Sequence, residues 1–297
     1  MAPKMMEEGR KEAEVSILHM RRARRHKPRT VFVLGGGGNL GAIQVGMLQA
    51  VFERGILPDA LVGCSVGAIN AAAVAADPTV EGVRRMSEVW ASLNDDAICP
   101  AGRLSSIRLL ATRSRSLQPN DGLRRLLETW LPFRTFEEAE LPFHVVAASL
   151  ETGDARWFSS GPVIEPILAS AALPGVFPPV PIADELFIDG GVIDNVPISR
   201  AVELGAERIV VLHVGNFERK RPAPKRPIDV LVQSFSIARS HRFLREIATP
   251  PEGVELIVVP SIDPGQLRYD DFRHSRRLIA GGHAAAAAHL DRVAATA

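Results

Sequence analysis

Short apolar runs alternate with longer segments of helical periodicity along most of this chain. Residues 30–34 form a β-branched and apolar run that predicts a buried strand, and residues 41–54 place apolar side chains at helical spacing. The pair recurs as the apolar run 60–64 and the alanine-rich segment 66–76. This alternation predicts an α/β fold with a mostly parallel central sheet covered by helices on both faces. Further strands are expected at residues 143–150, 155–158, 185–188, 208–214 and 254–260. Further helices are expected at residues 77–90, 163–173, 228–247 and 271–293.

The length of 297 residues is near the upper size for one cooperative core, and no low-complexity linker divides the chain. We therefore expect a single domain over residues 30–297, in which residues 30–215 carry the motifs and residues 216–297 complete the architecture. A hydrophobic fraction of 46% and a charged fraction of 23% exclude a wholly disordered or fibrous chain. Two cysteines, Cys64 and Cys99, exclude a disulfide scaffold and a four-cysteine zinc site. We expect no metal and no cofactor.

Charge is distributed unevenly between the start of the chain and the rest. Residues 1–29 hold nine Lys or Arg and four Glu, a net charge of +5, whereas residues 30–297 have a net charge of −4. The basic tail is interpreted either as a disordered arm or as a segment that contacts an anionic lipid surface or nucleic acid. An aromatic fraction of 5% disfavours base stacking, so we expect no nucleic-acid partner.

The sequence shows neither a secretory signal nor a membrane span. Residues 1–29 lack the apolar core of a signal peptide. The most hydropathic stretch, residues 60–76, is shorter than the ~20 residues that a span needs. We therefore expect a cytoplasmic protein that meets a membrane, if at all, peripherally through its basic tail.

Gly63-Cys64-Ser65-Val66-Gly67 has the pattern G-x-S-x-G and lies between a predicted strand and a predicted helix. A nucleophile on such a tight turn needs small residues two positions before and two after it, because the chain folds back on itself there. The following helix also points its positive N-terminal end at the site. Ser65 is therefore the candidate nucleophile, with Gly63 and Gly67 as its supports. The alternative is a serine that caps a buried helix.

Four consecutive glycines follow the first predicted strand. The loop GGGGNLG, residues 35–41, precedes a helix, so its backbone N–H groups can approach a negatively charged ligand without a Cβ clash. One interpretation is an oxyanion hole for a tetrahedral intermediate formed at Ser65. The nucleophile motif at the end of the next strand favours this interpretation over a plain tight turn.

A dinucleotide-binding loop is the competing interpretation of the same glycines. Gly36, Gly38 and Gly41 fit the pattern G-x-G-x-x-G. That function needs an acidic residue that ends the second strand. Asp59 is at about the right distance, but it precedes the second predicted strand instead of ending it.

Ser65 needs a base, and the chain offers two kinds. A Ser-His-Asp triad would draw on a later histidine, and the candidates are His144, His213, His241, His274, His283 and His289. None of them lies in an evident catalytic loop. Asp189, followed by Gly190 and Gly191, is the better candidate because it follows a predicted strand at a sharp glycine turn. A direct hydrogen bond to serine in a dry site makes a carboxylate a competent proton acceptor. Alone, the motif would be an ordinary Asp-Gly turn.

Taken together and in this order, the three motifs resemble those of the patatin-like phospholipases, in particular the soluble bacterial members. The matching segments are the glycine loop GGGNLG at residues 36–41, the elbow GCSVG at 63–67 and DGG at 189–191. Their surroundings are also similar, namely AIQVGML at 42–48, ASAALPGVFPP at 169–179 and DNVP at 194–197. The resemblance is strong over residues 30–215 and continues loosely to about residue 283.

The resemblance implies a three-layer patatin-like fold and a catalytic dyad of Ser65 and Asp189 without a histidine. The amides of Gly37 and Gly38, in a loop that includes Gly36, would form the oxyanion hole. The substrate would be a lipid or another acyl ester. Acylation would release an alcohol such as a lysophospholipid or a glycerol derivative, and water activated by Asp189 would then release the fatty acid.

One position departs from the family pattern, because members usually have Arg or Lys where this chain has Leu40. The preference for anionic head groups is therefore open. The alternative function is a catalytically weak or inactive patatin-like protein that binds a lipid or a partner. Residues 94–121 are expected to form loops and one short helix, and a lid or a substrate-facing insertion that shapes the acyl pocket would lie there. This segment carries a basic cluster of Arg103, Arg108, Arg113 and Arg115.

Overall fold

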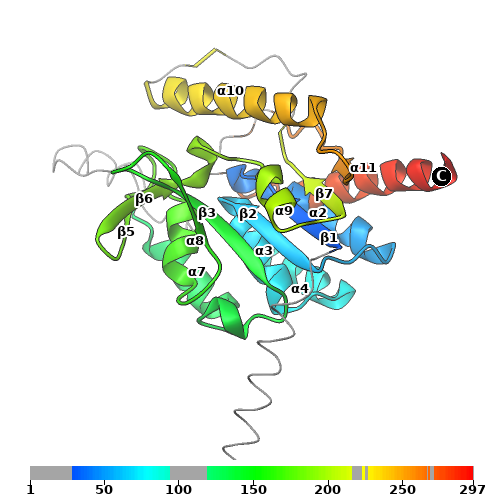
Figure 1. Cartoon of the computed structure of the whole chain (residues 1–297), viewed down its shortest axis with the longest axis horizontal. Coiled ribbons are helices and arrows are strands. Elements are labelled where there is room, and N and C mark those ends of the chain that lie inside the picture. Colours follow the sequence, from blue (N-terminus) through cyan, green and yellow to red (C-terminus); the bar gives the residue numbers. More distant parts are fainter. Residues whose placement is uncertain are drawn as a thin grey trace, which may run out of the picture.

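The computed structural model describes residues 29–93, 119–215, 223–224, 227–265, 267 and 271–296. The basic tail and most of the expected lid, residues 94–118, lie outside the described residues. In the described part, a twisted sheet lies between helices, and α10 lies across the top of the view in Figure 1. The three-layer α/β prediction is thereby confirmed.

Within the described residues, the central sheet has eight strands in the order β5-β6-β3-β2-β1-β7-β8, and β4 pairs with β3 outside that path. The strands are β1 (Thr30–Leu34), β2 (Ala60–Cys64), β3 (Phe143–Ser149), β4 (Ala155–Phe158), β5 (Val180–Ile182), β6 (Glu185–Asp189), β7 (Arg208–Leu212) and β8 (Glu255–Val259). The strands β3, β2, β1, β7 and β8 run parallel to one another. The strands β4 and β6 pair antiparallel with β3, and β5 pairs antiparallel with β6.

The register brings the three motifs to one level of the sheet. Leu34, the last residue of β1, pairs with Gly63 of β2, so the glycine loop and the serine turn leave the sheet at the same edge. On the other side of β2, Cys64 pairs with Val146. The antiparallel strand β6 ends opposite the next residue of β3, since Asp189 pairs with Ala147. The serine turn after β2 and the Asp189 turn after β6, which are far apart in sequence, therefore lie beside each other.

Helices cover both faces of the sheet. The α-helices are α2 (Gly41–Glu53), α3 (Val66–Ala76), α4 (Val80–Ser92), α7 (Asp121–Trp130), α8 (Ile164–Ser170), α9 (Ile198–Glu203), α10 (Pro227–Ala248) and α11 (Ser275–Thr296). Short 3-10 helices are η1 (Gly38–Leu40), η2 (Phe136–Glu138) and η3 (Gly190–Val192). None of the helices in the described residues has the length and apolar character needed to cross a bilayer.

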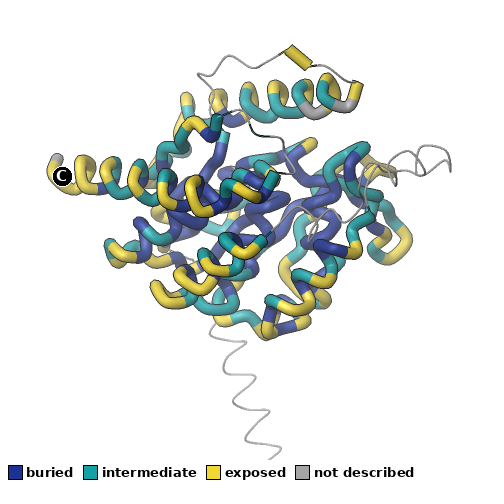
Figure 2. The backbone as a smooth tube through the Cα atoms, turned by 180° about the vertical axis from the view of Figure 1, so that it is seen from behind, coloured by how far each residue is buried: buried dark blue, intermediate teal, exposed yellow. Residues whose placement is uncertain are grey.

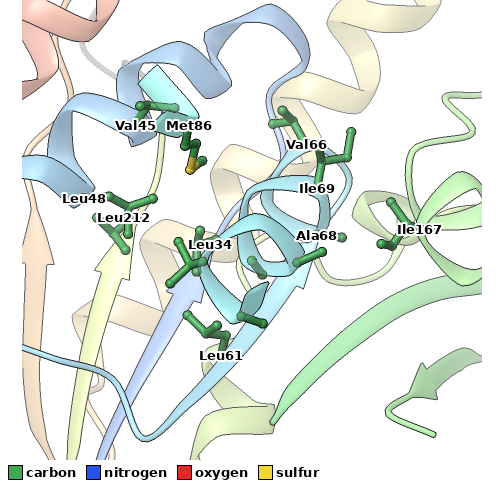
Figure 3. Packing of buried hydrophobic residues seen from close by; sticks show 14 of the residues in the cluster. Leu34, Val45, Leu48, Leu61, Val66, Ala68, Ile69, Met86, Ile167 and Leu212 are labelled. Carbon is green, nitrogen blue, oxygen red and sulfur yellow. The ribbon is translucent and has the colours of Figure 1, made fainter. Parts of the chain in front are cut away.

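Two buried clusters pack the sheet against these helices. Phe32 and Leu34 of β1 belong to the larger cluster with α2, α3, α4, α7, α8 and α11, whereas Val31 and Val33 belong to the smaller one with α9 and α10. The division follows from the alternation of strand side chains between the two faces. Figure 3 shows Leu34, Leu61 and Leu212 of three strands against helical residues of the larger cluster, and Figure 2 shows the sheet as the buried centre.

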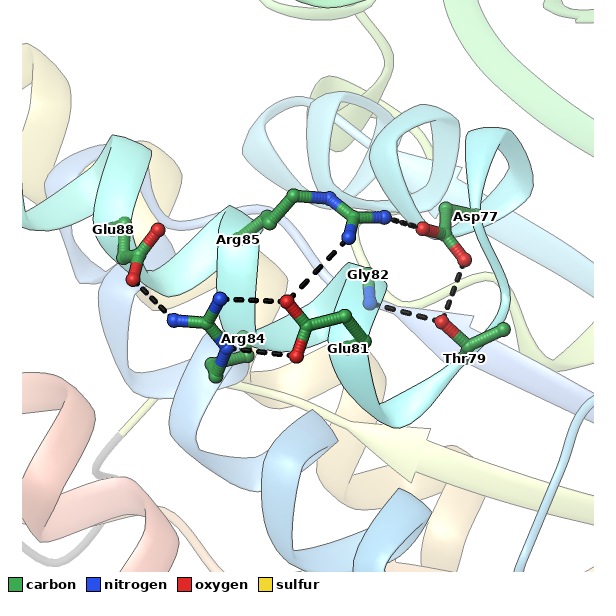
Figure 4. Close-up of polar contacts among 7 residues, drawn as sticks. All are labelled: Asp77, Thr79, Glu81, Gly82, Arg84, Arg85 and Glu88. Atoms are coloured by element: carbon green, nitrogen blue, oxygen red, sulfur yellow. Dashed lines mark hydrogen bonds and ion pairs between the residues drawn. The ribbon is translucent and has the colours of Figure 1, made fainter.

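The start of α4 differs from the helix expected over residues 77–90. The helix begins at Val80, and Thr79 is its N-cap with φ −120° and ψ 162°. The Thr79 hydroxyl accepts the Gly82 N–H at 3.0 Å and donates to Asp77 at 2.6 Å (Figure 4). The expected start was too early because Asp77 is the C-cap of α3, and its carboxylate accepts a hydrogen bond from the Thr79 side chain that caps α4.

Candidate active site

Ser65 is the single residue between β2 and α3. Its backbone has φ 55° and ψ −124°, a left-handed conformation that non-glycine residues rarely adopt. The Ser65 N–H donates to the hydroxyl of Ser170 at 2.8 Å, which fixes the turn from α8. Gly63 lies in β2 and Gly67 in α3. A Cβ atom on Gly67 would lie 2.0 Å from the Leu34 carbonyl oxygen, so the close approach of α3 to β1 requires glycine there.

The structure brings Ser65 and Asp189 together. The Ser65 Oγ donates a hydrogen bond to the Asp189 Oδ2 at 2.8 Å, and both residues are buried. The other carboxylate oxygen, Oδ1, accepts the Gly191 N–H at 2.7 Å and faces the Cys64 Sγ at 3.9 Å. Gly190 follows Asp189 at the start of η3. The carboxylate is thus held by several donors, with one oxygen directed at the serine hydroxyl.

Burial sets the protonation of this site. It raises the pKa of Asp189 above 3.8, and this rise is opposed by the charge of Arg239 and by the hydrogen bonds from Ser65 and Gly191. Burial also raises the pKa of the Cys64 thiol well above its ordinary value, and the negative charge of Asp189 acts in the same direction. The thiol therefore stays protonated at neutral pH, and it is a poor nucleophile beside Ser65.

A chain of buried amides supports the glycine loop. The Gln44 Nε2 donates to the carbonyl oxygens of Gly35 at 2.7 Å and Leu212 at 2.8 Å. The Gln44 Oε1 accepts the Asn70 Nδ2 at 2.9 Å, and the Asn70 Oδ1 accepts the Trp90 Nε1 at 3.0 Å. The sequence analysis did not predict these hydrogen bonds between buried amides. Their signal is the pair of amides on otherwise apolar helices, which need partners when buried.

Asn195 holds the glycine loop from the other side. Its carbonyl oxygen accepts the Gly36 N–H at 3.0 Å, and its Nδ2 donates to the Gly36 carbonyl oxygen at 3.3 Å. The Gly36 N–H is therefore already paired, and Gly36 supports the loop without being one of the two expected oxyanion donors. Gly37 and Gly38 stay candidates at the start of η1, where Gly38 has φ 60°. Gly41, also predicted to support the motif, opens α2.

A cavity of about 220 Å³ extends from Ser65 and Asp189. Its wall is mainly apolar, with Ile69, Trp90, Leu123, Trp130, Phe177 and Phe272 among its residues. Its polar lining residues include Asn195, His213, Ser236, Arg239 and Ser240. Asn195 contacts Gly36 of the glycine loop, and Arg239 contacts Asn195. A mainly apolar pocket with a few polar groups can hold a hydrocarbon chain with its ester beside the serine.

The histidines do not form a triad with Ser65, whose hydroxyl donates to Asp189. His213 lines the cavity, but burial lowers its pKa to about 4. Burial likewise lowers the pKa of His144 in β3 to about 4. His283 lies 2.7 Å from the Glu53 carboxylate on the α2–α11 side. The remaining candidates, His241, His274 and His289, are exposed or partly exposed and do not line the cavity.

The dinucleotide-binding interpretation also fails on geometry. Asp59 precedes β2 and accepts the N–H of Thr30, the first residue of β1, at 2.8 Å. The glycine loop follows Leu34 at the other end of β1, so Asp59 lies at the opposite edge of the sheet. Within the described ranges, no group of three or more His, Cys, Asp or Glu residues could hold a metal ion.

Comparison with known proteins links this site to a family. A family model described as "Patatin-like phospholipase" matches residues 32–202, from β1 into α9. "Patatin-like phospholipase domain-containing protein 7" of Rattus norvegicus is 30% identical over 186 residues, which are 62% of this chain and 13% of the relative. "Lysophospholipase nte1" of Aspergillus terreus is 30% identical over 216 residues, which are 68% of this chain and 13% of the relative.

The chain thus spans about an eighth of the length of these curated relatives. Among solved structures, VipD from Legionella pneumophila is similar with a TM-score of 0.47 and 15% identity, covering 90% of this chain and 67% of that chain. The family model matches more than half of the residues and includes the glycine loop, Ser65 and Asp189. The chain therefore belongs to the patatin-like phospholipase family.

Proposed function

We propose that the protein is a serine acyl hydrolase that cleaves fatty-acyl ester bonds of lipids, with Ser65 as nucleophile and Asp189 as base. The observation that carries the proposal is the 2.8 Å hydrogen bond from the Ser65 Oγ to the buried Asp189 carboxylate, at the end of an apolar cavity. Family membership and the name of the Aspergillus terreus relative support a lipid ester as substrate.

In the first step, the Ser65 Oγ attacks the ester carbonyl carbon while its proton passes to the Asp189 Oδ2. The carbonyl electrons move onto the oxygen and form a tetrahedral oxyanion. The amides of Gly37 and Gly38 would donate to that oxyanion, and the N-terminal end of α3 adds positive potential. Collapse of the intermediate expels the alcohol oxygen, which takes the proton back from Asp189 and leaves an acyl group on Ser65.

In the second step, water replaces the alcohol. Asp189 accepts a proton as the water oxygen attacks the acyl carbon, and a second tetrahedral oxyanion forms in the same glycine loop. Its collapse returns the proton to the Ser65 Oγ and releases the fatty acid. The raised pKa of Asp189 helps both steps, because a carboxylate with a higher proton affinity is a stronger base.

Labelling with a fluorophosphonate probe tests this proposal. We expect the folded wild type to be labelled, Ser65→Ala to be unlabelled and Asp189→Asn to be labelled far more slowly. His283→Ala is the matched control and should label like the wild type, since His283 pairs with Glu53 away from the cavity. Circular dichroism and thermal melting verify that each variant is folded.

Two results would count against the hydrolase. Label on Ser65→Ala would place the reactive group elsewhere, and labelling of Asp189→Asn at the wild-type rate would remove Asp189 as the base. A folded wild type that takes no label would favour the alternative function, a patatin-like protein that binds lipid without turnover.

A further inference from the structure

Arg239 brings a positive charge into the cavity from α10. Its Nη1 donates to the Asn195 Oδ1 at 3.3 Å, next to the Gly36 contacts of the same asparagine. Its Cδ lies 3.3 Å from the place that a Cβ on Gly191 would occupy, so the side chain lies over the turn after Asp189. The helix α10 lies beyond residue 202, where the match to the family model ends.

No carboxylate of the described residues lies within ion-pair distance of the Arg239 guanidinium. Arg242, three residues further on the same helix, differs because it pairs with Asp194 at 3.3 Å and with Glu246 at 2.9 Å. His213, the other basic residue of the described cavity wall, is neutral at pH 7 because burial lowers its pKa to about 4. Among the described residues, the half-buried Arg239 is therefore the cation that faces this cavity at neutral pH.

The surroundings of Arg239 on α10 suit an anionic group with several oxygens. Ser236 and Ser240 lie three residues before and one residue after it, and all three line the cavity. The Ser240 hydroxyl donates to the Ser236 carbonyl oxygen at 2.7 Å, so its proton is already used and Ser236 is the serine that can donate to such a group. Guanidinium and hydroxyl groups are common donors to phosphate oxygens. The glycine loop lines the cavity with Gly36, Gly37, Gly38 and Leu40, and none of these brings a charged side chain.

We propose that Arg239, together with Ser236, binds the phosphate group of a phospholipid or lysophospholipid, and so makes the enzyme prefer phosphate-bearing esters over neutral ones. This inference rests on the proposed hydrolase function and specifies its substrate. The acyl chain then lies along the apolar wall near Ile69 and Trp130, and the ester lies between the two at Ser65.

A pair of substrates that differ in the phosphate group tests the proposal. The substrates are 1-hexanoyl-lysophosphatidylcholine and 1-hexanoylglycerol, both used as monomers at pH 8. We expect Arg239→Leu to lower kcat/KM for the phosphate-bearing ester by about 10- to 100-fold, mainly through KM, because a charge-assisted hydrogen bond is lost. Hydrolysis of 1-hexanoylglycerol should change by less than about 3-fold.

Two further variants separate charge from structure. Arg239→Lys keeps the positive charge and should retain most of the preference. Arg245→Leu removes an exposed arginine of the same helix that does not line the cavity, and it should leave both substrates unaffected. An equal fall for both substrates in Arg239→Leu would overturn the proposal, since Arg239 would then act only through Asp189. Unchanged kinetics with the lysophospholipid would overturn it as well.

A binding measurement distinguishes failure of this inference from failure of the hydrolase proposal. Ser65→Ala is titrated by calorimetry with the same two lipids, alone and combined with Arg239→Leu or Arg245→Leu. Tighter binding of the lysophospholipid that is lost only with Arg239→Leu supports the phosphate subsite even if the wild type hydrolyses neither lipid. Equal binding of the lysophospholipid by all three proteins overturns the subsite, whether or not the wild type is active.

Discussion

Asp189 is a buried carboxylate that accepts a direct hydrogen bond from a serine hydroxyl. Replacement by asparagine keeps its size but removes the negative charge and the basicity. We expect Asp189→Asn to lower kcat for ester hydrolysis by about 100- to 10,000-fold, the usual contribution of general-base catalysis. Steady-state assays with thermal melting check this, and a folded variant with wild-type kcat would contradict the assigned base.

The pH dependence of hydrolysis should report the same carboxylate. Asp189 must be ionised to accept a proton, and burial raises its pKa above 3.8. Activity should therefore fall as the pH is lowered through that raised pKa, at a higher pH than for an exposed aspartate. Because the Arg239 charge lowers the Asp189 pKa, Arg239→Leu should move this acidic limb to higher pH. Profiles of kcat/KM with a neutral ester measure both effects, and coinciding profiles would contradict the coupling.

The protonation state of Asp194 affects the stability of the fold. Burial raises its pKa to about 6 from 3.8, although Arg242 and Ser199 oppose the rise. A folded-state pKa above the unfolded value favours folding below about pH 4, and this contribution is lost as the pH rises through about 6. Relative to wild type, Asp194→Asn should therefore gain about 2 kcal/mol in free energy of unfolding between pH 4 and pH 7. Urea denaturation at both values checks it, and a pH-independent difference would contradict it.

At the scale of elements, α2 and α11 cross at unusually short range. A Cβ on Gly46 would lie 2.0 Å from the Ile279 carbonyl oxygen, a backbone atom that cannot turn aside. We expect Gly46→Ala to lower the free energy of unfolding by about 1–3 kcal/mol, despite the higher helix propensity of alanine. Gly281→Ala is the control, because its Cβ would meet only the end of the Ile262 side chain, at 2.7 Å. Chemical denaturation compares them, and equal effects would argue against a backbone clash.

Elements with strong local signals were predictable from the sequence. The runs at residues 30–34 and 60–64 and the helix 66–76 match β1, β2 and α3, because apolar periodicity and glycine breaks act locally. The strand β5 and the helix α9 were not predicted. Each has only a few residues, and β5 contains Pro181, so pairing with β6 and packing on the sheet decide their structure.

The site divides in the same way. The sequence motifs identified Ser65 and Asp189 as candidates, and in the structure the Ser65 Oγ lies 2.8 Å from the Asp189 Oδ2. Their catalytic roles remain predictions. The antiparallel register of β6, which produces this approach, has no signal in the sequence. Asn195 and Ser170 belong to segments that matched the family pattern, but their contacts with the glycine loop and the serine turn depend on tertiary structure.

At the scale of the whole molecule, the cavity is built from two parts of the chain. Residues 32–202, which match the family model, supply Ser65, Asp189 and much of the apolar wall. Residues after 202 supply Arg239, Phe243 and Phe272 to the same cavity. Proteins that share the matched region can therefore differ in the lipids that they accept, because a separate part of the chain closes the pocket.

A substitution at Phe272 tests whether residues after 202 influence the choice of acyl chain. The centre of the Phe272 ring lies 6.2 Å from the centre of the Trp90 ring, and both residues line the cavity. Phe272→Leu should widen the pocket and raise the ratio of kcat/KM for dodecanoyl over butanoyl esters by about 3- to 10-fold, since each accommodated methylene contributes to binding. Phe52→Leu is the control, because Phe52 packs on Phe32 outside the cavity. An equal ratio in both variants would contradict a role for Phe272 in chain selection.

The left-handed backbone of Ser65 also has a consequence for protein engineering. Strain of this kind costs roughly 1–3 kcal/mol in a residue with a Cβ, and glycine avoids it. A library selected only for heat resistance would therefore enrich glycine at position 65, and the enriched clones would lack the hydroxyl that the proposed chemistry needs. Selection for thermal stability and selection for catalytic activity therefore favour different residues at position 65.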